Sequence, residues 1–233
     1  RLSALETRMA HYLSASAVSA KNLAEEKDAI KTLIGDISHQ TKTPIANLLL
    51  YAQLLEEQDL PPESREYVSA LEHQAEKLRF LIDALVKTSR LESGVLAMTP
   101  KRHGIQQLLD AASAQAAPGA EAKAITLTVE PTDLTARFDP KWTAEALYNL
   151  VDNAVKYTPA GGAVTLRAVG YELFCRVDVT DTGPGIPESE QARIFQRFYR
   201  SDASRSRATG GYGLGLSIAQ SIADAHKIRI QVG

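Results

Sequence analysis

Two asparagines four residues apart are the first feature of this sequence that could perform chemistry. Asn149 and Asn153 lie in the stretch 140–157, whose apolar residues have helical spacing, so both point to one face of that predicted helix. Their amide oxygens are hard ligands of the kind that Mg²⁺ favours, and Lys156 adds a positive charge nearby. The alternative is that these are solvated surface amides, and the helix alone leaves both interpretations open.

A carboxylate followed by glycines forms a second candidate site. Asp181 ends a predicted strand, and Gly183 and Gly185 follow it in "DTGPGIP". A carboxylate at a strand end can accept a hydrogen bond from a ligand amine, and glycines let the backbone approach a flat base. Many ordinary turns have this composition, so the motif by itself is weak.

A third candidate is a glycine-rich segment that leads into a helix. In "TGGYGLGLSIAQ" four glycines precede the predicted helix, at positions 210, 211, 213 and 215. Backbone N–H groups at a helix N-terminus bind anions, and glycines let phosphates come close, although the segment matches neither common nucleotide-binding glycine motif. Residues 188–210, upstream, carry five arginines and have the length of a lid or binding loop, with a solvated charged face as the alternative.

Composition narrows the class of protein. The 233 residues carry a formal net charge of −2, which argues against a nucleic-acid binder, and no apolar run is long enough for a transmembrane helix. The single cysteine, Cys175, excludes an internal disulfide and a cysteine-built metal site.

The distribution of glycine predicts two domains of different architecture. Of the 14 glycines, only Gly35 and Gly94 precede residue 99. The glycine-poor part has apolar residues at helical spacing and predicts one long helix over residues 1–57, kinked or loosened at Pro44, and a second over about 62–92.

A two-helix hairpin leaves apolar surface uncovered. Self-association into a four-helix bundle is the simplest way to cover it, so residues about 20–92 predict a homodimer. The alternative is that this surface packs only against the second domain.

The glycine-rich part alternates helices and strands. Helices are predicted over 105–117, over 140–157 with Asp139 as N-cap and Pro140 at the first position, and over "LGLSIAQSIADAH". Strands are predicted in "AITLTVE", "TARF", "AVTLRAV", "ELFCRVDVT" and the final "IRIQV". This order predicts an α/β sandwich, a sheet with helices on one face.

With these elements in place, the chain resembles the sensor histidine kinases of two-component systems over about 30–233. Five motifs stand in that family's order: "DISHQTKTPI", "NLVDNAVKYT", "DTGPGIP", "IFQRFYR" and "GGYGLGLS". The resemblance implies a signalling or coiled-coil helix over 1–29, a dimeric histidine-phosphotransfer hairpin over 30–95, and a catalytic ATP-binding domain over 100–233. That last domain should have the mixed-sheet fold shared with DNA gyrase B and MutL, its last strand missing here.

The resemblance also implies roles for single residues. His39 resembles the phospho-accepting histidine, a task that suits imidazole because it is nucleophilic when neutral, near physiological pH. Asn153 resembles the Mg²⁺ ligand with Asn149 beside it, and Asp181 the carboxylate that reads the adenine amino group. The other implied ATP contacts are Lys156, Tyr157, Gly183, Gly185, the lid residue Arg200, and the phosphate-loop residues Gly211, Gly213, Leu214 and Gly215.

The chain departs from the family pattern beside the histidine. Gln40 stands where the family usually has Glu or Asp, and an amide can orient the ring but cannot take its proton. Thr43 keeps the family residue that is tied to dephosphorylating the partner. Tyr212 replaces a usual Thr or Ser, which keeps the hydroxyl but adds bulk at the lid.

Three functions follow as hypotheses. The first is an ATP-dependent histidine kinase core that phosphorylates His39 and passes the group to a response-regulator receiver domain, as the cytoplasmic portion of a bacterial membrane-anchored sensor. The second is mainly a phosphatase or signalling scaffold, because of Gln40. The third, a stand-alone ATPase, is disfavoured because those enzymes carry a water-activating glutamate where Asn149 stands.

Overall fold

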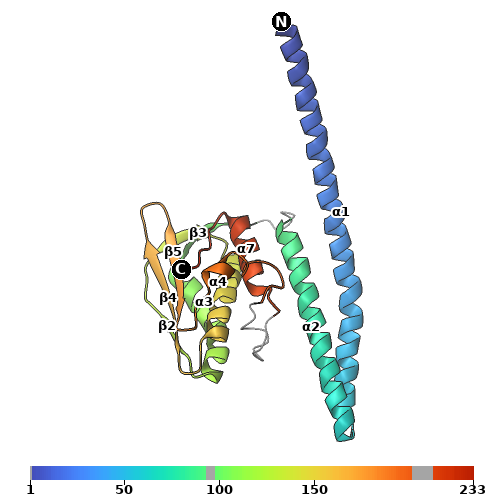
Figure 1. Cartoon of the computed structure of the whole chain (residues 1–233), viewed down its shortest axis with the longest axis vertical. Coiled ribbons are helices and arrows are strands. Elements are labelled where there is room, and N and C mark those ends of the chain that lie inside the picture. The colour runs from blue at the N-terminus through green and yellow to red at the C-terminus, as the bar shows by residue number, and fades with distance from the viewer. Residues whose placement is uncertain (1, 93–97, 201–211) are drawn as a thin grey trace. The chain divides into compact units, whose positions relative to one another are not determined.

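The computed structural model describes residues 2–92, 98–200 and 212–233 of the chain (Figure 1). The chain divides into two compact units, Arg1–Val95 and Leu96–Gly233, and each is described here by itself. Within the described ranges, no helix combines the length and the apolar character of a bilayer-spanning segment.

The first unit is a helical hairpin. Helix α1 (Leu2–Glu56) runs without interruption through Pro44, and α2 (Pro62–Glu92) folds back along its C-terminal half (Figure 1). Pro62 occupies the first position of α2, where its missing N–H costs nothing, and Glu63 in the first turn suits the positive end of the helix dipole. The two predicted helices are thus present, with α1 ending slightly before the expected residue.

The hairpin buries only a narrow apolar seam. One core cluster comprises Ile45 and Leu49 of α1 and Ala75 of α2, with Ile82 packed against it. The other buried apolar residues of the two helices are also mostly small: Ala52, Val68, Ala84, Val86 and Leu91. Many larger side chains remain exposed in the single chain, among them Tyr51, Leu54, Tyr67, Leu71, Leu78 and Leu85. Leu71, for example, is 65% exposed. The hairpin therefore has more apolar surface than its own two helices cover.

The second unit is an α/β domain. Its elements in chain order are β1 (Lys101–Gly104), α3 (Ile105–Ala122), β2 (Thr126–Val129), β3 (Thr135–Phe138), α4 (Pro140–Tyr157), β4 (Ala163–Gly170), β5 (Cys175–Asp181), α5 (Glu188–Gln191) and α7 (Gly215–His226). Strands β2, β4 and β5 form a mixed sheet, in which β2 is parallel and β5 antiparallel to β4. Strands β1 and β3 pair separately as an antiparallel ribbon.

The core of this domain lies between the mixed sheet and the helices. Val164 and Leu166 alternate along β4 and are fully buried, as are Leu109 of α3 and Val151 of α4. Figure 1 shows α3 and α4 lying together against one face of the sheet. The predicted fold class, a helical hairpin followed by a mixed sheet with helices on one face, is confirmed.

Three details of the predicted elements are wrong. Helix α3 continues to Ala122 instead of ending at 117, because Ala116 and Ala120 stay buried in the core on both sides of Pro118. Strand β1 was not expected, since its four residues are polar apart from one glycine and pair only with the distant β3. Residues 227–233, although described, form no strand.

The start of α4 is held by a capping carboxylate. Asp139 accepts hydrogen bonds from the backbone N–H groups of Lys141 and Trp142 with one oxygen, and from the N–H and hydroxyl of Thr99 with the other. Burial by itself would raise the pKa of Asp139, but these four hydrogen bonds outweigh it and hold the pKa below its ordinary value. The predicted N-cap is therefore confirmed, and it ties α4 to the segment that precedes β1.

Because this pKa is lower in the folded than in the unfolded state, the charged form stabilises the domain above about pH 4, and that contribution is lost as the pH falls through the folded-state value. We expect Asp139→Asn to lower the free energy of unfolding by about 1 kcal/mol near neutral pH, and by clearly less near pH 3. Urea unfolding followed by the fluorescence of Trp142, the single tryptophan, measures this. The exposed Asp133→Asn is the control, and an equal loss at both pH values would contradict the assignment.

Candidate nucleotide-binding site

The two asparagines of α4 use their amide nitrogens on their own helix. Nδ2 of Asn149 donates to the carbonyl of Glu145 at 2.9 Å, and Nδ2 of Asn153 donates to the carbonyl of Asn149 at 3.0 Å. Both side chains are half-buried. With the nitrogens engaged in this way, the Oδ1 atoms are left as acceptors, which is the arrangement that a cation or a donor group on a ligand requires.

The N-terminus of α7 lies directly against this face of α4. A Cβ atom on Gly215 would lie 3.1 Å from Oδ1 of Asn149 and 3.5 Å from Nδ2 of Asn153, so glycine permits the close approach. Leu214 is buried, and its carbonyl accepts a hydrogen bond from the hydroxyl of Ser217 at 2.9 Å, which fixes the first turn. The N–H groups of that turn have no acceptor within the helix and make a favourable place for anionic oxygens beside the asparagines.

The C-terminal end of α4, one turn beyond Asn153, meets the loop after β5. Oδ1 of Asp181 accepts a hydrogen bond from the N–H of Gly183 at 2.8 Å and closes a tight turn. A Cβ on Gly183 would lie 2.6 Å from that oxygen and 3.3 Å from the carbonyl of Tyr157. Gly185 has a φ of +71°, which a residue with a side chain rarely adopts. The exposed Asp181 carboxylate thus sits next to the last residue of α4 and keeps a second oxygen for a ligand donor.

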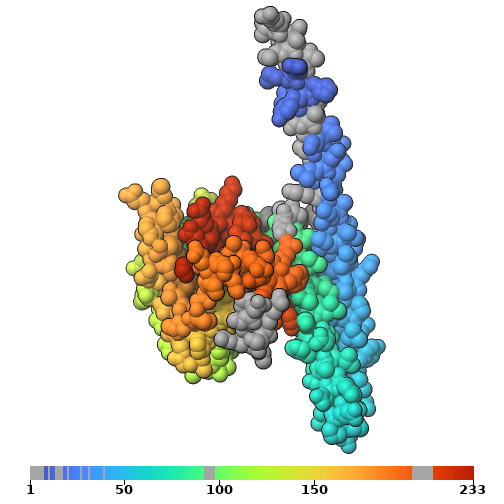
Figure 2. Space-filling model, in the orientation of Figure 1, coloured from blue at the N-terminus to red at the C-terminus, as the bar shows by residue number. Residues whose placement is uncertain are grey.

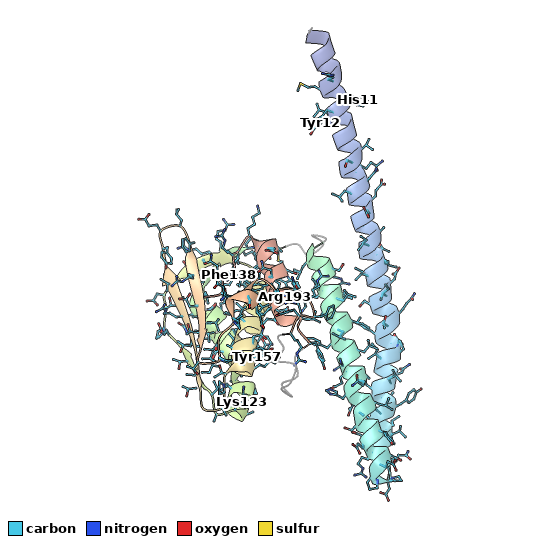
Figure 3. The ribbon with its side chains drawn as sticks, in the orientation of Figure 1. His11, Tyr12, Lys123, Phe138, Tyr157 and Arg193 are labelled. Carbon is cyan, nitrogen blue, oxygen red and sulfur yellow. The ribbon has the colours of Figure 1, made fainter. Side chains whose placement is uncertain are left out.

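The segment after α5 packs its backbone onto Gly213, just before α7. The N–H of Phe198 donates to the carbonyl of Gly213 at 2.9 Å. Phe198 has a φ of +62° and Gly213 one of +70°, and a Cβ on Gly213 would lie 2.6 Å from the carbonyl of Tyr199. The Arg193 guanidinium lies over the Tyr199 ring, and Figure 3 shows Arg193 in front of the helical layer. The hydrogen bond between Phe198 and Gly213 joins the predicted lid to the predicted phosphate loop.

Lys156 is positioned differently from the other predicted contacts. Its ammonium forms an ion pair with Asp152 of the same helix, with a distance of 2.5 Å. Burial, and then the negative charge of Asp152, raise the pKa of the neighbouring Tyr148. Asp152 is not among the residues expected from the sequence, although its spacing of four residues from Lys156 is the usual signal for such a pair.

The structure describes the remaining predicted site residues only in part. Arg200 is half-buried, and Gly211 lies outside the described residues. His39, Gln40 and Thr43 lie on α1 of the other unit, where Gln40 and Thr43 are exposed, while the His39 side chain lies outside the described part. The roles of all these residues stay predictions.

The donor set fits a Mg²⁺–nucleotide complex. Oδ1 of Asn149 and the N–H groups of the first turn of α7 lie close together, with the Asn153 side chain beside them, because Gly215 has no Cβ to hold the two helices apart. Among the described residues, no group of three or more His, Cys, Asp and Glu side chains could hold a metal by itself. Amide oxygen is an acceptable Mg²⁺ ligand when phosphates supply most of the charge.

The mixed sheet with helices on one face, together with the asparagines and the α7 N-terminus that meet at Gly215, is typical of a nucleotide-binding domain of the mixed-sheet ATPase class. The sequence model for histidine kinase-, DNA gyrase B- and HSP90-like ATPases matches residues 138–233. The model for the His kinase A phospho-acceptor domain matches residues 29–94.

Similar proteins agree with both matches. The sensor protein DivL of Caulobacter vibrioides is 34% identical over 216 residues, which cover 91% of this chain and 27% of DivL. The signal transduction histidine-protein kinase BarA of Escherichia coli K12 is 32% identical over 213 residues, 87% of this chain and 23% of BarA. Full-length ShkA, solved in complex with AMPPNP, is 31% identical with a TM-score of 0.69, and the match covers 83% of this chain and 41% of ShkA.

The chain therefore belongs to the two-component sensor histidine kinases, and the resemblance seen in its motifs is confirmed. It spans about a quarter of the length of the curated relatives DivL and BarA.

The glycine contacts yield a prediction about stability. Gly185→Ala should cost about 1 kcal/mol, because only the left-handed backbone is penalised there, whereas Gly213→Ala should cost about 2–3 kcal/mol because the added methyl also meets the Tyr199 carbonyl. Gly104→Ala, with an ordinary φ of −69° and open space, is the matched control. Urea unfolding followed by Trp142 fluorescence ranks the three, and equal losses at Gly213 and Gly185 would refute the close contact.

Proposed function

We propose that this chain is an ATP-dependent protein-histidine kinase core that phosphorylates itself on His39 and transfers the phosphoryl group to an aspartate of a response-regulator receiver domain. The observation that carries the proposal is the meeting of Asn149, Asn153 and the α7 N-terminus at Gly215, in a chain whose other unit bears the phospho-acceptor motif. The ATPase-family match and the AMPPNP complex of the related ShkA support ATP as the nucleotide.

Adenine recognition is assigned to the end of α4 that meets the loop after β5. The free oxygen of Asp181 accepts a hydrogen bond from the adenine amino group, since Oδ1 is already used by Gly183. Glycines at 183 and 185 let the base approach the backbone, and Tyr157 lies beside them.

Phosphate binding is assigned to the other end of the site. The N–H groups around Leu214 and Gly215 hold phosphate oxygens, and the amide oxygens of Asn153 and Asn149 hold the Mg²⁺, which neutralises phosphate charge when bound. Lys156 reaches the phosphates by exchanging its Asp152 partner for them. Arg200 contributes a further positive charge from the lid, with Gly211 and Gly213 completing the phosphate loop.

The chemical step needs a neutral His39. One ring nitrogen attacks the γ-phosphorus, an N–P bond forms, and the bond between that phosphorus and the β–γ bridging oxygen breaks, so that ADP leaves with the electron pair. The proton on the other ring nitrogen must then depart. Gln40 has no basic group to accept it, so the proton passes to water, and we expect this step to be slow.

A second function, dephosphorylation of the regulator, is favoured by the residues beside His39. Thr43 is exposed one turn further along α1, and its hydroxyl can hold an attacking water against a phosphoaspartate. Because Gln40 weakens only the forward reaction, the balance between the two activities should lie toward the phosphatase.

The hairpin is the proposed dimer interface. Its own core is small, and the exposed side chains of Tyr51, Leu54, Tyr67 and Leu71 form apolar surface on both helices. A second hairpin covers this surface in a four-helix bundle. Light scattering on the chain tests this, and a monomer at micromolar concentration would overturn it.

The names of the relatives support a sensory setting. DivL is a sensor protein and BarA a signal transduction kinase, both several times longer than this chain. We therefore place the chain in the cytoplasmic portion of a bacterial membrane-anchored sensor, with residues 1–29 as the helix that delivers the signal. Membrane fractionation of the full-length protein tests the location.

Incubation with ATP labelled at the γ-phosphate, in the presence of Mg²⁺, tests the kinase proposal. The label should be acid-labile and base-stable, and should be absent from His39→Gln, because only His39 has the phospho-acceptor context. His73→Gln, a substitution of an exposed histidine on α2, should label normally. Undiminished label in His39→Gln would reject the site.

Paired variants test the balance between the two activities. Gln40→Glu supplies the missing base and should raise the rate of autophosphorylation about tenfold. Thr43→Ala should slow phosphate release from the phosphorylated regulator while leaving autophosphorylation nearly unchanged. An unaltered rate in Gln40→Glu would show that proton removal does not limit the kinase, and equal phosphate release in Thr43→Ala would remove the role of Thr43.

A further inference from the structure

A lysine outside all five motifs is bound to the end of the helix that carries the asparagines. Lys123 is the C-cap of α3, just before β2. Its Nζ donates to three carbonyls of α4 and its cap: Val155 at 2.8 Å, Lys156 at 2.9 Å and Thr158 at 2.5 Å. An ammonium has three N–H donors, so every one of them is used.

These contacts complete the C-terminus of α4. The last carbonyls of a helix have few backbone partners and carry the negative end of the helix dipole, so a cation is favourable there. The backbone of Lys123 takes part as well, because its carbonyl accepts a hydrogen bond from the N–H of Gly161 in the turn after α4. Lys123 therefore holds both the helix end and the following turn.

The same helix end borders the loop assigned to adenine. The carbonyl of Tyr157 is in contact range of Gly183, and Gly162 packs against the side chains of Thr158 and Thr182. The hydroxyl of Thr182 also accepts a hydrogen bond from the N–H of Ala163 at 3.0 Å. Figure 3 shows Lys123 and Tyr157 at the same end of the helical layer. A shift of this end would change the distance between α4 and the Asp181 turn.

We propose that Lys123 is a positioning residue for nucleotide binding: it holds the C-terminus of α4 so that Tyr157 and the Asp181–Gly183 turn keep the spacing that a purine needs. The inference rests on the proposed ATP-binding function. It assigns to Lys123 no contact with the nucleotide and no part in the transfer of the phosphoryl group.

Two measurements on the full chain test this proposal. Calorimetry measures the binding of AMPPNP with Mg²⁺, and a kinetic assay measures the phosphorylation of His39. Lys123→Met removes all three donors and should raise the Kd for AMPPNP and the KM for ATP about tenfold, while kcat at saturating ATP stays within about twofold. Lys123→Arg restores a cation with several donors and should recover most of the affinity. Lys101→Met, which removes an exposed lysine from β1, should bind as the unchanged chain does.

Melting of each variant without nucleotide, followed by Trp142 fluorescence, separates this role from a purely structural one. A lower melting temperature with an unchanged Kd, measured well below melting, would overturn the proposal. If Lys123→Met does not fold, Lys123→Gln, which keeps two amide donors, decides by the same criterion. Failure of the unchanged chain to bind AMPPNP would overturn the ATP-binding function itself and this inference with it, whereas normal binding by the unchanged chain and by Lys123→Met would overturn the inference alone.

Discussion

The close approach of α7 to α4 is the constraint on which the rest of the candidate site depends. Gly215 meets the asparagine face of α4 at a distance that leaves little room for a side chain, so the first N–H groups of α7 come close to the side-chain amides of Asn149 and Asn153. In the proposed site, each of the two helices would supply only part of the contacts to a Mg²⁺–nucleotide complex. The N–H groups suit phosphate oxygens and the amides suit a hard cation, and the two demands are met together only in this packing.

That packing requires α4 to be held at both ends. The Asp139 carboxylate satisfies the first N–H groups of the helix and also binds Thr99. At the other end, the carbonyls of the helix and its cap accept hydrogen bonds from the Lys123 ammonium. Between the ends, fully buried Val151 packs against the sheet through the apolar core (Figure 2 shows the domain surface that encloses it). These contacts hold the polar face of α4 in a fixed position relative to the loops after β5 and before α7.

The helical hairpin, by contrast, leaves many of its large apolar side chains exposed. A pair of helices buries one seam, and the seam found here is small, with Ile45 and Leu49 as its largest members on α1. Large apolar side chains such as Tyr67 and Leu71 stay exposed in the single chain. The unit that carries His39 therefore exposes apolar surface that association with a second copy would bury. The α/β domain buries its main apolar core between its own sheet and helices.

Much of the fold followed from local patterns. Helical periodicity and the cap residues Asp139 and Pro140 placed α4 to the residue, because capping and apolar spacing are decided within one turn of the chain. Five motifs in the order typical of the family indicated which family the chain resembles. The extension of α3 through Pro118 and the pairing of β1 were not predictable, since both rest on contacts with distant segments that outweigh local propensity.

For the site, the sequence by itself determined which residue types were available: amides on one helix face, a carboxylate at a strand end and glycines before a helix. Only the tertiary structure decided that Asn149 meets Gly215, that Gly183 meets Tyr157, and that Phe198 bonds to Gly213. It also placed Lys123 on the end of α4. The reason is that spacing along the chain defines faces and turns, whereas distances between segments far apart in sequence are set by how the core packs.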